Sequence, residues 1–204
     1  MLKGMTAHYL LRRVYAVKAG DTILIHAAAG GVGLIACQWA KALGATVIGT
    51  VGSKEKAAEA KAHGCDHPIL YREEDFAART REITKGEGVP VVYDSVGKDT
   101  FAKSLDCLRP LGYFVSFGSA AGQIEAFNIN ILQTKGSLFA TRPTLNNYAA
   151  KREDLMAMAA DLFKVVGSGA VRIPINQKYP LKDAAKAHKD MEGRETTGST
   201  ILIP

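Results

Sequence analysis

The sequence predicts an α/β protein built around one doubly wound, parallel sheet of six strands with helices on both faces. Short, almost wholly apolar strand patterns alternate with helical patterns through residues 22–141. Such alternation is typical of right-handed crossovers and of a parallel sheet that is covered on both faces. A glycine-rich turn also follows the first strand and opens the first helix. Six strands of this kind match the two halves of a Rossmann sheet.

The first half of this sheet lies within residues 22–71. Each strand is a short run rich in β-branched residues. The helices carry start and stop signals, because Ser53 can cap the second helix while Gly44 and Gly64 follow the ends of the first two. In chain order we expect a strand at 22–26, a helix at 32–43, a strand at 46–51, a helix at 54–62 and a strand at 69–71.

The second half repeats the pattern. Pro90 lies near the start of the fourth strand, where a missing N–H disturbs the ladder least. We expect a helix at 76–84, a strand at 89–94, a helix at 100–108, and strands at 113–117 and 137–141. Outside the sheet we expect a helical opening up to about Val17, a helix at 148–166, and a tail with a strand at 171–175, a helix at 181–191 and a strand at 199–203.

The composition excludes several classes of protein. With 47% hydrophobic and 23% charged residues, the 204-residue chain is typical of globular proteins. No uncharged apolar run approaches the roughly 18 residues of a membrane span. His8, Arg12 and Arg13 interrupt the start of the chain, so we expect no secretory signal. Three widely spaced cysteines predict reduced thiols in a cytoplasmic protein rather than a disulfide framework.

The net charge of +6, from 26 basic and 20 acidic residues, has two interpretations. Nucleic-acid binding is the less favoured one, because basic and acidic residues are mixed, as in Lys151-Arg152-Glu153-Asp154. No nucleic-acid-binding motif accompanies them. A small anionic partner such as a phosphorylated cofactor would use the same surplus of positive charge.

The segment from Ile23 to Leu34 carries the most information. It reads ILIHAAAGGVGL and contains A-x-G-x-x-G, with Ala28 where the dinucleotide fingerprint usually begins with glycine. Gly30 lets the backbone approach a pyrophosphate, and Gly33 lets helix and strand pack closely. The first turn of the helix then presents N–H groups and its dipole to the phosphates. A tight turn without a ligand is the alternative, and the surrounding strand–turn–helix context disfavours it.

The end of the second strand indicates which dinucleotide is bound. NAD sites usually place Asp or Glu there for the ribose 2′-hydroxyl, but this chain has TVGSKEK at residues 50–56. Ser53 and Lys56 would instead favour a 2′-phosphate. The alternative is that Lys54 and Lys56 are simply the solvated face of a helix. NADP(H) is therefore the predicted coenzyme, and Tyr71 at the end of the third strand would lie close to its adenosine phosphate.

Other catalytic patterns are absent from the sequence. The run HGCDH at residues 63–67 lacks the second pair of ligands that structural zinc needs, and it lies at a helix-to-strand boundary. We therefore predict no metal site. No tyrosine has a lysine four positions later, and there is no G-x-S-x-G elbow. We assign no catalytic side chain.

Several longer blocks resemble one family. HAAAGGVGLIACQWAKALGATVIGTVGS, YREEDF, VVYDSVGKDTF, GYFVSFGSAAG, KGSLFATRP and KYPLKDAAKAH resemble the zinc-free, zeta-crystallin-like quinone oxidoreductases of the medium-chain dehydrogenase/reductase superfamily. The resemblance covers essentially the whole chain. It implies hydride transfer from NADPH to a quinone or similar electrophilic carbonyl. It also implies a homodimer that pairs through the edge strand near residues 137–141.

The resemblance also implies roles for individual residues. The pyrophosphate would lie on the glycine loop, the 2′-phosphate at the second strand end, and the nicotinamide towards the fifth, with Thr6 near its ring. The residues carried over are Gly30, Gly31, Val32, Gly52, Ser53, Lys56, Tyr71, Phe117, Gly118, Ser119 and Arg194.

Members of this family begin with a GroES-like substrate domain, and the chain starts where that domain would end. We therefore expect residues 1–170 to form the dinucleotide-binding domain with its N-terminal helix. Residues 171–204 would be a tail, the remnant of the substrate domain that it would otherwise join. Two functions follow as hypotheses: a quinone reductase, with weak turnover by this chain alone, or a truncated NADP(H)-binding module with little or no turnover.

Overall fold

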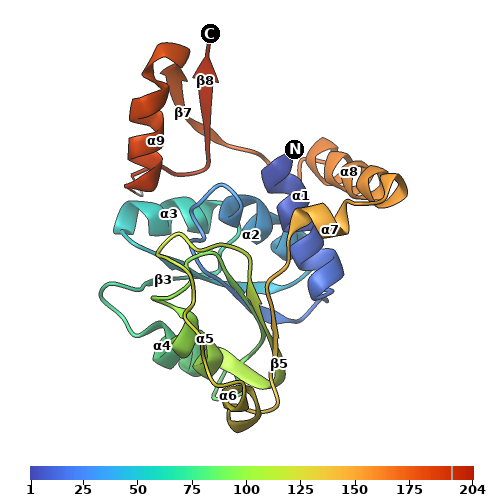
Figure 1. The fold of residues 1–204 in the computed structure, drawn as a ribbon, viewed down its shortest axis with the longest axis vertical. Helices are drawn as coiled ribbons and strands as arrows, with labels where there is room; N and C mark the ends of the chain where they lie inside the picture. The colour runs from blue at the N-terminus through green and yellow to red at the C-terminus, as the bar shows by residue number, and fades with distance from the viewer. Residues whose placement is uncertain (194) are drawn as a thin grey trace.

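The computed structural model describes residues 1–193 and 195–204, and its main feature is a six-stranded sheet (Figure 1). The strand order is β3-β2-β1-β4-β5-β6, and every neighbouring pair is parallel. The strands are β1 (Thr22–Ile25), β2 (Thr46–Val51), β3 (His67–Leu70), β4 (Val89–Asp94), β5 (Leu108–Ser116) and β6 (Phe139–Thr141). This is the predicted doubly wound order, in which the winding reverses between β1 and β4.

Alternate residues of each central strand face opposite cores. Ile23 and Ile25 of β1 belong to one hydrophobic cluster, and Leu24 between them belongs to the other. The same alternation holds in β4, where Val91 and Tyr93 face the first cluster and Val92 faces the second. Because successive side chains of a strand point to opposite faces, an all-apolar strand requires cover on both sides.

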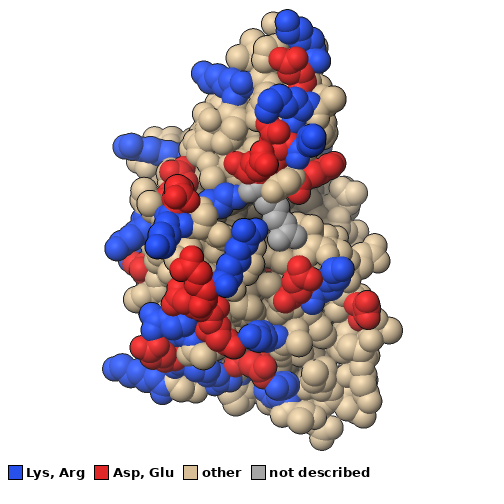
Figure 2. Space-filling view, turned by 90° about the vertical axis from the view of Figure 1, so that its left-hand side faces the viewer, with Lys and Arg blue, Asp and Glu red and all other residues tan. Residues whose placement is uncertain are grey.

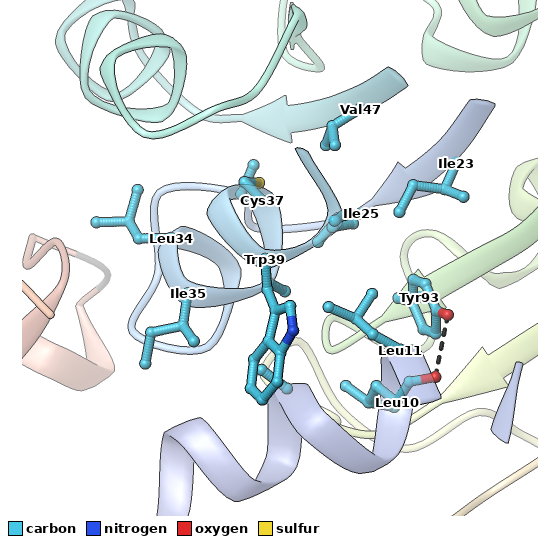
Figure 3. Close-up of a cluster of buried hydrophobic side chains, with 14 of the residues drawn as sticks. Leu10, Leu11, Ile23, Ile25, Leu34, Ile35, Cys37, Trp39, Val47 and Tyr93 are labelled. Carbon is cyan, nitrogen blue, oxygen red and sulfur yellow. Dashed lines mark hydrogen bonds between the residues drawn. The ribbon is translucent and has the colours of Figure 1, made fainter. Parts of the chain in front are cut away.

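The helices provide that cover. Residues of α1 (Leu2–Tyr9), α2 (Gly33–Ala42), α3 (Lys54–Ala62) and α8 (Arg152–Gly167) belong to the first cluster, and residues of α4 (Phe76–Ile83) and α5 (Phe101–Cys107) belong to the second. Figure 3 shows part of the first cluster, to which Trp39, Leu10 and Leu11 belong. The Tyr93 hydroxyl donates to the carbonyl of Leu10 at 3.0 Å, which ties the opening segment to the sheet.

The tail forms a second small unit above the sheet domain. In it β7 (Ile175–Pro180) and β8 (Ser199–Ile203) pair in parallel, and α9 (Ala184–Glu192) connects them on the side of α3 (Figure 1). Gly198 N donates to Ala29 O at 3.1 Å, so the tail contacts the glycine loop directly. The proposed boundary between residues 170 and 171 stays a prediction.

Several predicted boundaries were wrong. A strand was expected at 171–175, but β7 begins at Ile175, after a segment in which Arg172 N donates to Gln38 Oε1 at 2.9 Å. The helix expected at 148–166 is divided into α7 (Leu145–Tyr148) and α8. The opening helix continues from α1 into a π-helical turn, η1 (Leu10–Val14), and a short α6 (Asn130–Thr134) was not predicted. These shifts depend on long-range contacts rather than on local pattern.

The surface carries charges of both signs. Figure 2 shows Lys and Arg interspersed with Asp and Glu over the face that includes α3 and α9, without a large area of one sign. Within the described residues, no helix is both long enough and apolar enough to cross a membrane. The three cysteines are free and buried; the sequence predicted free thiols but not their burial.

Candidate functional site

A cleft of about 670 Å³ opens at the carboxyl ends of the strands. Loops that follow β1, β2, β3, β4 and β5 contribute to its wall, together with α1 and the tail. Ligands of doubly wound sheets bind at this edge, near the point where the strand order reverses. The cleft brings together most of the predicted site residues: Gly30, Gly31, Val32, Gly52, Ser53, Lys56, Tyr71 and Phe117.

The glycine loop is packed so closely that side chains would not fit. A Cβ on Gly31 would lie 2.6 Å from Lys3 Nζ and 2.7 Å from the Gly198 carbonyl oxygen. A Cβ on Gly33 would lie 2.6 Å from the Ala28 carbonyl oxygen. Gly33 thus allows α2 to begin directly against the loop, and Gly31 allows Lys3 and Gly198 to approach the loop closely.

The N-terminus of α2 is available to an external anion. No side chain caps it and its first turn has no acidic residue, whereas α3 and α4 are capped by Ser53 and Asp75. An uncapped helix start presents N–H groups and a partial positive charge. A phosphate at this position would satisfy both.

The end of β2 has the predicted polar character. Ser53 Oγ accepts a hydrogen bond from Lys56 N at 3.3 Å and so caps the N-terminus of α3. Ser53 also lines the cleft. A Cβ on Gly52 would lie 3.5 Å from the Tyr71 hydroxyl, which places the ends of β2 and β3 side by side. Glu55 is nearby and fully exposed, and the hydrogen bond with Ser53 holds the pKa of its carboxyl below the ordinary value.

A buried network of hydrogen bonds around His26 lies behind the wall of the cleft. His26 is 1% exposed, with Nδ1 2.8 Å from Thr50 Oγ1 and Nε2 2.9 Å from Ser104 Oγ. Because the Ser104 hydroxyl donates to Thr100 O, its oxygen accepts from Nε2–H, and Nδ1 accepts from the Thr50 hydroxyl. Burial lowers the pKa of His26, which keeps this neutral tautomer. Thr50 and Thr100 themselves line the cleft.

Asp94, at the end of β4, has a structural task. Its carboxylate accepts hydrogen bonds from Val96 N, Gly97 N and the Thr100 hydroxyl, at 2.6, 3.1 and 2.7 Å. With all three donors aimed at it, this fully buried carboxylate shapes the turn that brings Ser95 and Val96 to the cleft.

Some predicted residues do not line the cleft. Gly118 and Ser119 lie just beyond Phe117 and are not part of the wall, and Thr6 donates its hydroxyl to Leu2 O within α1. Arg194 lies outside the described residues.

The sequence interpretation missed other residues of the wall. Lys3 reaches it from α1, and Arg72, next to Tyr71, holds its guanidinium 5.9 Å from the Tyr71 ring centroid. The tail contributes Met191, Thr196, Gly198 and Thr200. Arg72 follows the predicted site residue Tyr71, so its position in the sequence could have indicated that it lines the cleft. Lys3 and the tail are distant from the glycine loop in sequence, and no motif near them indicates a part in the site.

The described residues do not offer a zinc ligand set. No three His, Cys, Asp or Glu side chains gather in the described part of the chain in a way that could hold a metal ion. In the segment around residues 63–67, the Asp66 carboxylate accepts a hydrogen bond from Val47 N at 2.9 Å and forms an ion pair with Lys41 at 2.5 Å. These contacts give Asp66 a structural role.

Comparison with known proteins places these features in a family context. Residues 31–163 match a family model described as zinc-binding dehydrogenase. A quinone oxidoreductase of Pseudomonas aeruginosa is 56% identical over 204 residues, which is all of this chain and 63% of that protein. A 2-haloacrylate reductase of a Burkholderia species is 51% identical over 205 residues and covers all of this chain and 62% of its own.

Solved structures of quinone oxidoreductases have the same fold as this chain. The structure of an Escherichia coli quinone oxidoreductase complexed with NADPH has 53% sequence identity and a TM-score of 0.97, over 100% of this chain and 63% of that one. This chain thus spans less than two thirds of the length of these relatives.

Proposed function

This chain belongs to the zinc-binding dehydrogenase family, and on that premise we propose that it serves the NADPH-dependent reduction of quinones. The observation that carries the proposal is the cleft, in which an uncapped helix start and a closely packed glycine loop adjoin Ser53 and Lys56. Relatives at 53–56% identity named quinone oxidoreductase support it, one of them solved with NADPH.

The residues present fit such a dinucleotide. Gly30, Gly31 and Val32 would hold the pyrophosphate, because all three line the cleft at the start of α2, where the helix dipole favours negative charge. The second strand end, with Gly52, Ser53, Lys56 and Tyr71, would take the 2′-phosphate. The family resemblance adds Arg194 to this group. Phe117, Gly118 and Ser119 would lie towards the nicotinamide, with Thr6 near the ring.

When bound, the coenzyme supplies the hydride, and the protein supplies binding, orientation and electrostatics. The reduced quinone can take its proton from water, so the reaction needs neither a strong side-chain acid nor a bound zinc ion. We therefore assign no catalytic side chain and expect the reaction to be zinc-free. Positioning alone contributes a large part of a rate enhancement.

A coenzyme titration tests the first half of the proposal. We expect NADPH to bind more tightly than NADH, and Lys56→Ala to weaken NADPH binding about tenfold while leaving NADH binding unchanged, because a charge-assisted contact to the 2′-phosphate is lost. Isothermal titration calorimetry measures both constants, with Lys164→Ala on α8 as the control. Equal affinity for the two coenzymes would contradict the proposal.

A turnover assay tests the second half. We expect this chain to oxidise NADPH slowly when a naphthoquinone is added, whereas a coenzyme-binding module would bind NADPH without oxidising it. 2-Chloroacrylate is the second acceptor to test, since a relative at 51% identity is named a 2-haloacrylate reductase. Faster turnover with 2-chloroacrylate than with the quinone would replace the substrate class in our proposal.

We further propose a cytoplasmic homodimer that pairs through β6. This strand is one of the two edge strands of the sheet, and its three residues are exposed. Phe139 is 50% exposed and stacks on Tyr113. An apolar edge with unpaired backbone groups is suited to sheet extension by a second copy.

A further inference from the structure

Lys3, in the first turn of α1, extends its ammonium group into a junction of three segments. Its Nζ lies 3.4 Å from Gly198 O and 3.4 Å from Ser199 Oγ, both in the tail. The same Nζ is 2.6 Å from the place where a Cβ on Gly31 would lie. The ammonium group is therefore next to the glycine loop, although residues 3 and 31 are distant in sequence.

The charge of Lys3 is poorly compensated. Its two hydrogen-bond partners are neutral oxygens, and both distances exceed the usual 2.7–3.2 Å of a good N–H···O bond. Among the described residues it forms no ion pair with a carboxylate. Burial lowers the pKa of its amine, which reflects a partly desolvated cation. An ammonium group has three donors, so a stronger acceptor could still be added.

The cleft offers a place for that acceptor. Lys3, Gly30, Gly31 and Val32 all line it, and the N-terminus of α2 faces the same space. An anion held by the loop would be close enough to the ammonium group to replace long, neutral hydrogen bonds by a charge-assisted one. Such bonds are about twice as strong as neutral ones.

We propose that the ammonium group of Lys3 binds the pyrophosphate of the dinucleotide and holds it against the glycine loop. This inference rests on the proposed coenzyme. Lys3 would act on the part that NADPH and NADH share, whereas Lys56 acts on the 2′-phosphate that only NADPH has. The two lysines thus have separable effects on affinity.

The alternative is that Lys3 only holds the tail against the loop. The tail also lines the cleft, through Met191 and Thr196 among others. A loosened tail would weaken every ligand of the cleft. A lost pyrophosphate contact would weaken only ligands that carry a pyrophosphate.

The test measures the binding of three ligands to three variants by calorimetry, one of the variants being a control. The ligands are NADPH, NADH and adenosine 2′-monophosphate, which has the 2′-phosphate but no pyrophosphate. Lys3→Met keeps the aliphatic stem and removes the charge. We expect it to weaken NADPH and NADH by the same factor, about tenfold, and to leave adenosine 2′-monophosphate unchanged. Lys56→Met should weaken NADPH and adenosine 2′-monophosphate and spare NADH. Lys164→Met on α8 is the matched control.

The outcomes separate the two claims. Unchanged dinucleotide binding in Lys3→Met, or a parallel loss of adenosine 2′-monophosphate binding, overturns the role of Lys3 while the proposed coenzyme stands. If the wild-type chain binds neither dinucleotide, the proposed coenzyme fails first and the role of Lys3 fails with it. Thermal unfolding of Lys3→Met at the wild-type temperature confirms that the variant is folded.

Discussion

His26 illustrates how a single side chain links the first strand to the coenzyme cleft. Its ring is held between Thr50 and Ser104, and it packs edge-on against Phe76 at a centroid distance of 4.9 Å. Thr50 and Phe76 both line the cleft. His26 is therefore a buried residue that supports the wall of the site, with both ring nitrogens hydrogen-bonded.

The stability of the protein should depend on pH through this residue. The folded-state pKa of His26 is lowered, so below about pH 6.5 the unfolded chain binds a proton that the folded chain does not. The free energy of unfolding should then fall with decreasing pH, by at most about 1.4 kcal/mol per pH unit, until the folded pKa is reached.

Urea unfolding of the wild type and His26→Gln at pH 7.5, 6.5 and 5.5 measures this effect. The variant should be less stable at pH 7.5 by about 1–3 kcal/mol, because hydrogen bonds are lost. The difference between the two proteins should shrink at pH 5.5. His8, whose pKa is also lowered, is present in both proteins and cancels in the comparison. A difference that is the same at all three pH values would contradict this account.

At the scale of elements, the start of α2 depends on the absence of a side chain. The nearest atoms to a Cβ on Gly33 are backbone atoms of Ala27 and Ala28, which cannot move without shifting the loop. Gly167, near the end of α8, has nothing within 4 Å of its Cβ position. Close packing therefore requires a glycine at position 33, whereas the space around position 167 would accommodate a side chain.

Substitution by alanine should separate those reasons. Gly33→Ala should lower the free energy of unfolding by about 1–3 kcal/mol through overpacking. Gly167→Ala should raise it by roughly 0.5–1 kcal/mol through helix propensity. Urea denaturation measures both, and wild-type stability for Gly33→Ala would show that the loop can relax.

At the scale of the whole molecule, β6 is a terminal strand of the sheet and its residues are exposed. Among the described strands β6 is terminal in the sheet, and Phe139 stacks on Tyr113 at 4.7 Å instead of being buried. We expect Phe139→Lys to shift the proposed homodimer to monomer, because a charge on the edge opposes pairing.

Sedimentation equilibrium measures this shift. Phe163→Lys is the matched control, since Phe163 is 62% exposed on α8, away from the edge strand. A wild-type chain that is already monomeric, or a Phe139→Lys protein that stays dimeric, would remove β6 as the interface.

The predicted bounds of helices and strands match the structure most closely where the apolar pattern and the turn residues indicate the same boundary. β2, α3 and β4 lie at the predicted positions. Gly44 gives a local signal before β2, and Ser53 and Gly64 give signals at the two ends of α3. The strand predicted at 171–175 was wrong, since the pairing of β7 with β8 extends to Pro180 and depends on residues about 20 positions away. Local preference could not reveal that register.

The sequence by itself determined the sheet, its order and the glycine loop, because strand–helix alternation, glycine positions and the missing carboxylate after β2 are local properties. Only the tertiary structure decided which distant residues complete the cleft. Lys3 and Gly198 meet Gly31 because α1 packs on α2 and the tail hydrogen-bonds to Ala29. Packing between elements brings these residues together, and no window of the sequence contains that information.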